Sequence, residues 1–367
     1  MMQQTSFLPW LCLLAVLTET SSLHEPLSSV GSEEPDICVE PGVCTPLPSA
    51  YSEILPVKPR RQWMIDGGFC GALSLQVAAM THGVWISQDL VRKANTHGEG
   101  HGNPAEGYEV LPTNIVETAS ALKLRFSEWN YLSLSPQASA FKAWMKSHLV
   151  KREPVIWFPI CKGDDHLPYP GSAPNAGHFD HIEPVIGIGS RHSLNDTAVY
   201  DDDWLVHFSG HDFQPYYRYF HTLEDDLKMD GNCKEAQPGI GKNEMYPCIS
   251  ESVTYGLAVT GLQIDVPTLR VTLEVDQQEE PVVRRGEAPT DLHASVTVWG
   301  LQVGKRYALY RYNSTDSLPS AALDIGFEHK TYFLGKDEVW TYKDPHPINS
   351  SGVAYYVAVR LPDVYVC

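Results

Sequence analysis

The sequence is poor in positive charge. Its 27 lysine and arginine residues stand against 45 aspartate and glutamate residues, which gives a formal net charge of -18 at pH 7. Like charges repel, so this balance argues against nucleic-acid phosphates or an anionic membrane as the main partner. Hydrophobic residues make up 43% of the chain and charged residues 20%, which is typical of a globular protein and excludes a wholly disordered one. The charge suits an extracellular protein or one from an acidic compartment.

Long apolar runs are also scarce. The run "FLPWLCLLAVL" at residues 7–17 is too short to cross a bilayer comfortably, and small residues, "TETSS", follow it. We therefore predict a signal peptide at residues 1–22, although its first six residues contain no lysine or arginine; an uncleaved anchor is the alternative. No later stretch of about 18 apolar residues occurs. The expected product has no membrane partner after signal removal and is secreted, or reaches a lysosome or vacuole.

Three glycosylation sequons agree with this route. They begin at Asn195, Asn313 and Asn349. A single Asn-x-Ser/Thr match is a weak signal, but three in an exported chain predict that at least one is glycosylated.

Cysteine is scarce too, and its number is informative. Of the eight cysteines, Cys12 belongs to the predicted signal, so seven remain. In an oxidising compartment most should pair, and an odd number leaves at least one outside any disulfide within the chain. The candidate pairs are Cys38–Cys44, Cys233–Cys248 and Cys161–Cys367. On this pairing Cys70 is the cysteine left over, although sequence alone does not fix the connectivity.

The composition and the secondary-structure pattern of the sequence change along its length, and we find no internal repeat. Residues 23–58 are rich in Pro, Ser and Glu and predict an extended lead-in or pro-segment. Residues 59–263 begin with helical patterns and continue with strands, which predicts an α+β domain. Residues 264–367 contain short alternating strands between turn signals, as in an all-β sandwich. The stretch "TVWGLQVGKRYALYRYNS" within them resembles a hairpin of fibronectin type III or immunoglobulin-like modules.

The stretch "DGGFCGALSLQVAAM" places Cys70 at the start of a predicted helix. A helix N-terminus carries partial positive charge, which stabilises a thiolate. Gly67, Gly68 and Gly71 permit a tight turn and close approach of a substrate. Three readings remain open for Cys70: half of a disulfide, a small buried hydrophobe, or a nucleophile.

Downstream residues favour the nucleophile. A thiolate mechanism needs a base and a group that orients the base. His181 directly precedes the predicted strand of "HIEPVIGIGS", and "VYDDDW" places carboxylates on the next strand. We expect a histidine at the start of one strand and an aspartate on its hairpin neighbour to lie within hydrogen-bond reach.

The segment 62–203 resembles the papain-like cysteine peptidase fold, and most nearly the bacteriocin-leader (double-glycine) processing peptidases of the C39 type. The resemblance rests on Gln62, on Cys70 with the following Gly-Ala-Leu-Ser-Leu, and on His181 ahead of "VIG". It implies a Cys-His-Asp triad, with an oxyanion hole formed by the Gln62 side chain and the Cys70 N–H. The implied substrate is a peptide or amide, and neither a cofactor nor a metal is implied.

Alternatives remain within this assignment. Gln62 lies eight residues before Cys70, slightly further than the family's usual gap. His178 competes with His181 as the base, and we prefer His181. Among the acids we prefer Asp202, then Asp201, with Asp203 as a further alternative. Strand alternation puts Asp202 on the face opposite to the other two, and the sequence leaves open which of these faces meets His181. The loops rich in histidine and acidic residues match no zinc or calcium spacing, so no metal site is predicted.

The sequence thus predicts a secreted cysteine hydrolase, most simply a peptidase. One alternative is a catalytically inactive secreted glycoprotein that binds peptide or glycan through the same fold. Another is a structural extracellular glycoprotein in which Cys70 is merely buried or joins two chains. The C-terminal sandwich would bind a glycan or a protein partner, or would brace the first domain by packing.

Overall fold

The structure, a computed structural model, describes most of the chain beyond residue 36. The described ranges are 37–40, 43–45, 51–63, 68–95, 102–103, 107–130, 137–162, 178–223, 255–276, 291–318, 326–349 and 352–362. The predicted signal peptide, residues 1–22, lies outside them. The described residues form a β-rich α+β fold, so this coarse fold class is confirmed.

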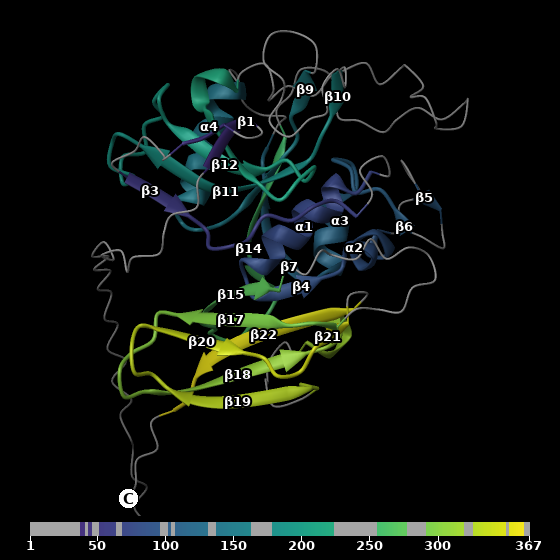
Figure 1. The fold of residues 1–367 in the computed structure, drawn as a ribbon, viewed down its shortest axis with the longest axis vertical. Coiled ribbons are helices and arrows are strands. Elements are labelled where there is room, and N and C mark those ends of the chain that lie inside the picture. Colours follow the sequence, from purple (N-terminus) through teal and green to yellow (C-terminus); the bar gives the residue numbers. More distant parts are fainter. Residues whose placement is uncertain are drawn as a thin grey trace, which may run out of the picture. The chain divides into compact units, whose positions relative to one another are not determined.

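A nine-stranded sheet forms the larger part of the fold (Figure 1). Its strands run in the order β2-β1-β13-β12-β11-β8-β14-β7, with β3 paired to β11. All its pairings are antiparallel except that of β1 with β13. The strands are β1 (Ile37–Glu40), β2 (Val43–Thr45), β3 (Tyr51–Ile54), β7 (Leu124–Glu128), β8 (Val155–Trp157), β11 (Glu183–Ser190), β12 (Trp204–Phe208), β13 (Pro215–Tyr219) and β14 (Gly256–Leu262).

Four helices accompany this sheet in the described residues: α1 (Cys70–Met80), α2 (Gln88–Ala94), α3 (Ile115–Ala121) and α4 (Gln137–Leu149). Helix α1 contacts β11, β8 and β4 (Val84–Ile86), and every one of its residues is buried. A helix that is apolar all round belongs in a core, and "CGALSLQVAAM" has that pattern. Ser87 caps α2 by accepting a hydrogen bond from Leu90 N, as its position in the sequence predicts.

The C-terminal strands form two further antiparallel sheets. One has the order β15-β17-β20 and the other β19-β18-β22-β4. Residues from both contribute to one apolar cluster, including Leu273 and Val296 from the first and Leu309 and Tyr356 from the second. The strands are β15 (Arg270–Val275), β17 (Ala294–Trp299), β18 (Arg306–Tyr312), β19 (His329–Leu334), β20 (Val339–Lys343) and β22 (Val353–Arg360).

Strand β22 extends this second sheet to the N-terminal half of the chain. It pairs antiparallel with β4, which follows α1 directly, so that Tyr355 lies opposite Val84. Tyr355 also donates a hydrogen bond to Leu122 O. Strand pairing therefore joins segments on the two sides of residue 264, where the sequence changes from mixed helix and strand patterns to strand patterns alone.

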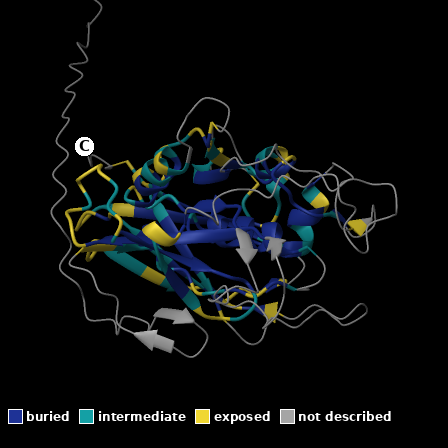
Figure 2. Ribbon diagram, turned by 90° about the horizontal axis from the view of Figure 1, so that it is seen from above, coloured by how far each residue is buried: buried dark blue, intermediate teal, exposed yellow. Residues whose placement is uncertain are grey.

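Short elements complete the described fold. Three two-stranded ladders pair β5 with β6, β9 with β10 and β16 with β21, and two 3-10 turns occur. Their bounds are β5 (Gly102–Asn103), β6 (Gly107–Tyr108), β9 (Ile160–Lys162), β10 (His178–Asp180), β16 (Asp291–Leu292), β21 (Ile348–Asn349), η2 (Phe220–Thr222) and η3 (Thr315–Ser317). Figure 2 shows buried residues gathered in the central strands and helices, with exposed residues mainly in connections and at edges.

Two predicted elements differ from the structure. The apolar spacing of "PTNIVETASALKL" predicts a helix over residues 112–124, but α3 ends at Ala121, because Lys123 adopts φ 59° and the chain leaves the helix to form β7. The strand expected over "TAVYDDDWLVHFS" begins only at Trp204, and Asp201 and Asp202 occupy a turn before it. This second difference matters for the site described below.

The features tied to the secretory route are only partly within the described residues. Asn195, Asn313 and Asn349 are all exposed, as a glycosylated asparagine must be. Cys38 lies directly opposite Cys44 in the β1–β2 ladder, and the Cα spacing of such partners fits a disulfide. The side chain of Cys161, and all of Cys233, Cys248 and Cys367, lie outside the described part. No described helix is long and apolar enough to cross a membrane.

His82, just beyond α1, makes stability depend on pH. Its Nε2 lies 3.0 Å from Val259 O, and burial lowers its pKa to about 4, with Arg270 lowering it further. In the unfolded chain the pKa is about 6.5, so unfolded molecules take up this proton first as the pH falls. The histidine's contribution is therefore complete above about pH 6.5 and is lost towards pH 4.

We expect His82→Gln, which retains a donor for Val259 O, to reduce this pH dependence. The free energy of unfolding of the wild type should fall between pH 7 and pH 5 by about 1 to 2 kcal/mol more than that of the variant. Urea titrations at the two pH values measure the difference. Equal losses in both proteins would contradict the assignment.

Candidate functional site

Cys70 is the first residue of α1, as the sequence predicts. It is 8% exposed, and its N-cap residue, Phe69, supplies no side-chain hydrogen bond to the helix terminus. Helix α1 is eleven residues long, and its N-terminal amides and dipole favour negative charge at this end. The sulfur therefore lies where a thiolate is stabilised.

The start of α1 packs directly against the segment that carries His181. A side-chain carbon at Gly71 would come within 2.5 Å of Val110 O and 3.1 Å of Ile182 Cδ1, so glycine permits this close approach. The Ser74 hydroxyl lies 2.8 Å from Cys70 O and 3.1 Å from Ile182 O, and can donate to either carbonyl. One buried hydroxyl thus joins the residue before Gly71 to the residue after His181.

The imidazole of His181 is held in one orientation. It is 4% exposed, and its Nε2 lies 2.6 Å from the carbonyl oxygen of Ser209. A carbonyl oxygen only accepts, so Nε2 carries a proton in this arrangement. In the neutral ring the lone pair is then on Nδ1, which is the tautomer required of a base that acts through Nδ1.

A buried carboxylate accompanies His181. Glu183 is fully buried, and its Oε1 lies 3.7 Å from His181 Nε2. Its Oε2 lies 2.8 Å from His207 Nδ1 and accepts a hydrogen bond of 3.2 Å from Trp157 Nε1. These two contacts fix the carboxyl group, which would stabilise an imidazolium on His181.

His211 forms another wall of this site. Its ring meets the ring of His181 edge-on, with 5.0 Å between the centroids. Burial lowers the pKa of His211 to about 4, and His181 lowers it further. His211 is therefore neutral near pH 7 and adds no cation beside His181.

Gln62 approaches the same site from the segment before α1. The Gln62 N–H donates to Gly210 O at 2.8 Å, and Gly210 follows the Ser209 carbonyl that accepts from His181. On the other side, fully buried Gln88 donates to Arg61 O at 3.0 Å and accepts from Trp63 N at 3.1 Å. Hydrogen bonds therefore fix Gln62 on both sides, and its side chain, 5% exposed, points into the protein near Gly210.

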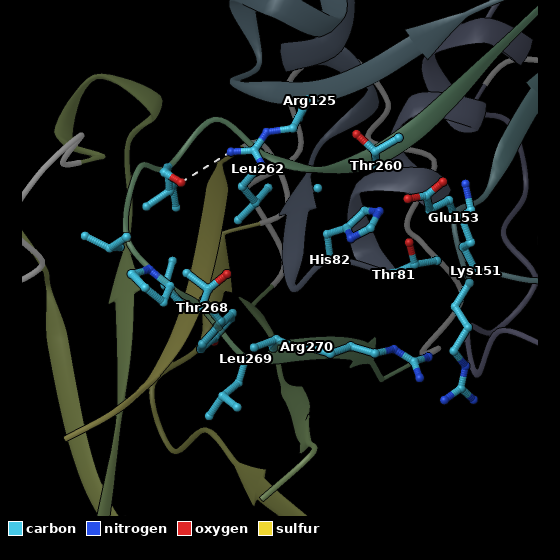
Figure 3. Close-up of a pocket in the computed structure, with 18 residues that line it drawn as sticks. Thr81, His82, Arg125, Lys151, Glu153, Thr260, Leu262, Thr268, Leu269 and Arg270 are labelled. Carbon is cyan, nitrogen blue, oxygen red and sulfur yellow. Dashed lines mark hydrogen bonds between the residues drawn. The ribbon is translucent and has the colours of Figure 1, made fainter. Parts of the chain in front are cut away.

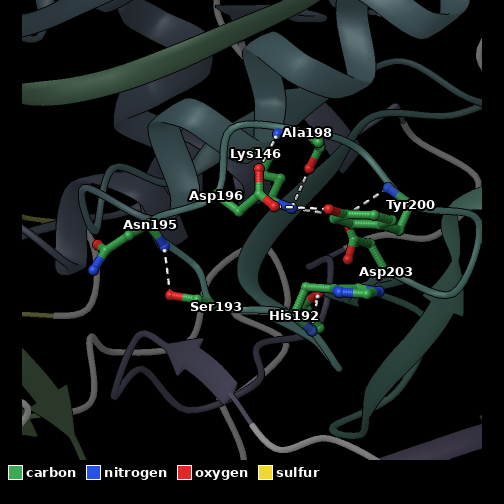
Figure 4. Close-up of polar contacts among 9 residues, drawn as sticks. Lys146, His192, Ser193, Asn195, Asp196, Ala198, Tyr200 and Asp203 are labelled. Atoms are coloured by element: carbon green, nitrogen blue, oxygen red, sulfur yellow. Dashed lines mark hydrogen bonds and ion pairs between the residues drawn. The ribbon is translucent and has the colours of Figure 1, made fainter.

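The structure does not bring the predicted aspartates to His181. Asp202 forms a half-exposed ion pair with Arg191, at 3.7 Å. Asp203 is fully buried, accepts from Tyr200 N and forms an ion pair with Lys146 Nζ at 2.9 Å (Figure 4). The carbonyl of Asp201 lies 2.8 Å from His221 Nδ1.

The strand register explains this placement. In the β11–β12 hairpin Gly189 pairs with Trp204, and Val185 pairs with His207. The aspartates therefore lie beside the end of β11, whereas His181 precedes its start, roughly 25 Å away at 3.3 Å per residue. In an antiparallel hairpin the start of one strand faces the end of the next, and here Ser209, which directly follows β12, contacts His181.

Sequence reasoning therefore missed Glu183 and Ser209. Glu183 follows His181 by two residues, so strand alternation alone would have placed both side chains on one face. Counting the hairpin in the antiparallel sense would have pointed to the end of "WLVHFS". The alternative base, His178, lies on β10 opposite Lys162; its side chain and residues 64–67 fall outside the described part.

Gly210 offers a test of how this site is assembled. It adopts φ +74°, and a side-chain carbon there would come within 2.3 Å of Leu73 Cδ2 and 3.2 Å of Gln62 Cγ. We expect Gly210→Ala to lower the free energy of unfolding by about 2 to 3 kcal/mol and to displace Gln62. Gly300, at φ +76° with nothing within 4 Å of such a carbon, provides the matched control.

Gly300→Ala should cost only the backbone strain of about 1 kcal/mol. Chemical denaturation of both variants measures the difference. Equal losses would show that Gly210 is required for its backbone conformation alone and not for the fit between Gln62 and Leu73.

These groups are of the kinds that nucleophilic chemistry uses. A cysteine at a helix N-terminus, a histidine of fixed tautomer, a buried carboxylate and an amide side chain are the components of thiol-based acyl transfer. Comparison with known protein families, with curated proteins and with solved structures finds no match.

Proposed function

We propose that the protein is a secreted cysteine hydrolase of papain-like type, acting on peptide or amide bonds. The observation that carries the proposal is the contact between the start of α1 and the segment 181–183. Ser74 and Gly71 join the helix that begins at Cys70 to Ile182, and Ser209 O fixes the adjacent His181. The sequence resemblance to double-glycine processing peptidases supports the same chemistry.

The mechanism follows from the roles of these groups. His181 Nδ1 takes the proton of the Cys70 thiol, and the thiolate attacks the carbonyl carbon of the substrate. The Cys70 N–H and the Gln62 side chain stabilise the oxyanion that forms. The imidazolium gives its proton to the leaving amine, and water then hydrolyses the thioester with His181 as base. Ser209 O and Glu183 replace the predicted aspartate as the groups that orient and stabilise His181.

The remaining features fit an exported, modified protein. The proposal includes glycosylation at one or more of the three exposed asparagines, and a disulfide between Cys38 and Cys44. The C-terminal sheets, which resemble a fibronectin type III or immunoglobulin-like sandwich in sequence, would bind a glycan or protein partner or brace α1 through the β22–β4 pairing.

Thiol labelling combined with substrate profiling tests this function. We expect Cys70 in the native protein to react with iodoacetamide at pH 5.5 at least tenfold faster than free cysteine, because a thiolate is the reactive form. His181→Ala should remove this advantage, and the wild type should cleave members of a peptide library. Labelling no faster than free cysteine would overturn the proposal.

One observation favours a second function, a binding protein without catalysis. His181 Nε2 lies 2.6 Å from the backbone oxygen of Ser209, whereas the carboxylate oxygen Oε1 of Glu183 is 3.7 Å away. Such a site would bind peptides without cleaving them. Saturable binding of library peptides, with no product after long incubation, distinguishes this function from hydrolysis.

A further inference from the structure

A second site lies at the opposite end of α1 from Cys70. The C-terminal turn of α1, the connection between β14 and β15, and the turn between α4 and β8 enclose a cleft of about 440 Å³ (Figure 3). This volume is within the usual range for small-molecule sites. The cleft does not include Cys70, His181 or Gln62 among its described lining residues.

The cleft is cationic although the chain as a whole is strongly acidic. Four cationic side chains line it in the described residues, Arg125, Lys151, Arg152 and Arg270, against the one carboxylate of Glu153. Glu153 Oε2 is engaged with His148 Nδ1 at 2.6 Å. In a chain whose net charge is -18, such a local excess of positive charge indicates attraction for an anion.

Arg270 is the most informative of these cations. Its Nη1 and Nη2 atoms are shielded from solvent and have no hydrogen-bond partner among the described residues. The guanidinium stacks over Trp299, 5.0 Å from the ring centroid, and Arg152 lies 5.7 Å from the same centroid. Burial of this kind normally requires an acceptor for each guanidinium nitrogen.

Neighbouring groups only partly balance Arg270. Glu53 pairs with Arg152, its Oε1 lying 2.5 Å from Arg152 Nε, and it also attracts Arg270. Burial lowers the pKa of Arg270 to about 10, with Arg152 lowering it further, so the side chain remains charged at neutral pH. His82, whose pKa is about 4, is neutral there.

Apolar side chains form one part of the remaining cleft wall, beside Thr81, Thr260 and Thr268. Figure 3 shows Leu262 and Leu269 along its walls, with Arg270 extending towards the end that holds Lys151 and Glu153. Ile264, Val266 and Val357 also line it. A cavity with a cationic end and an apolar wall is complementary to a ligand that has an anionic group at one end and an apolar body.

We propose that this cleft binds a small amphipathic anion, with a phosphate, sulfate or carboxylate group at Arg270 and an apolar body against the Leu262–Leu269 wall. Rotation about the terminal bonds of Arg270 would turn its nitrogens into the cleft, where an oxyanion would accept two hydrogen bonds in the geometry that guanidinium favours. Lys151 and Arg152 would add charge at the same end. The site is separate from the proposed catalytic groups and does not depend on hydrolysis.

Calorimetric titration of the full chain with octyl phosphate tests the proposal. Inorganic phosphate and octanol at matched ionic strength serve as the two partial ligands. We expect saturable binding of octyl phosphate, at least tenfold tighter than that of inorganic phosphate, because each buried methylene contributes to binding. Arg270→Gln should weaken the binding tenfold or more, whereas Arg306→Gln, which removes an exposed arginine on β18, should leave it unchanged.

Each outcome bears on the proposal. Absence of saturable binding to the wild type overturns it, whatever the fate of the variants. Equal binding to the wild type and Arg270→Gln overturns the role of Arg270, and Arg152→Gln provides an independent second variant should the first fail to fold. Equal binding of inorganic and octyl phosphate overturns the role of the apolar wall.

Discussion

Replacing Cys70 with alanine should lower the rate of peptide or amide hydrolysis by about 1000-fold or more, because no other group of the site supplies a thiolate. The substitution removes one sulfur atom from a residue that is 8% exposed. It leaves Gly71, Ser74 and their contacts with Ile182 in place. Turnover of the best library peptide by wild type and variant provides the comparison.

Two controls separate chemistry from folding. The free energy of unfolding of Cys70→Ala should lie within about 2 kcal/mol of the wild-type value, since the change in side-chain volume is small. It should also bind the substrate peptide with unchanged affinity. If Cys70→Ala retains more than a tenth of the wild-type rate, Cys70 is not the nucleophile of the reaction.

Replacing Lys146 with methionine should lower the free energy of unfolding by about 3 to 5 kcal/mol. Lys146 is 2% exposed and its Nζ contacts Asp203 Oδ2 at 2.9 Å and Ala198 O at 2.5 Å (Figure 4). Asp203 is fully buried, so methionine would leave its carboxylate without its cationic partner. Breaking one side of a buried pair costs more than the pair contributes.

A second buried change and a surface pair provide the controls for Lys146. Replacing Asp203 with leucine in the same variant should recover most of the loss, because no buried charge then remains. Lys58→Met, which removes one side of the exposed pair with Glu274, should cost less than about 1 kcal/mol. If Lys146→Met and Lys58→Met lower the free energy of unfolding by similar amounts, the buried Lys146–Asp203 pair contributes no more to stability than the exposed pair does.

The same experiment decides what Asp203 does. In the structure its carboxylate belongs to the Lys146 pair at the far end of the hairpin from His181. We therefore expect variants at Asp203 to lose activity only in proportion to the folded fraction. The stabilised double variant should hydrolyse peptides at close to the wild-type rate.

Local patterns predicted the elements well where one signal dominated. The apolar sequence of α1 and the serine cap of α2 each have one physical reading, and the structure confirms both. Strands β11, β17, β18 and β22 follow from their β-branched and aromatic runs. The end of α3 was harder, because the left-handed conformation of Lys123 has no signal in a residue type that favours helix.

Only the parts of the site that depend on neighbouring residues in the sequence were predictable. Cys70 at a helix start and His181 beside a strand depend on neighbouring residues in the sequence. The groups around His181 depend on hairpin register, which the position of β12 determines, and a shift of the expected strand start from Asp201 to Trp204 moved the acids away from the histidine. Gln88 holds the backbone on both sides of Gln62, through Arg61 and Trp63. These contacts join residues about 26 positions apart in the sequence, so no local pattern predicts them.

The pairing of β22 with β4 has a consequence for how the protein is made. Strand β4 follows α1 immediately, and Val84, Trp85 and Ile86 are buried, yet the strand that pairs with them ends at Arg360. During synthesis from the N-terminus, the helix that begins at Cys70 would lie beside an uncovered apolar strand until β22, about 270 residues further along the chain, has left the ribosome. Folding around the proposed nucleophile is thereby tied to the synthesis of β22.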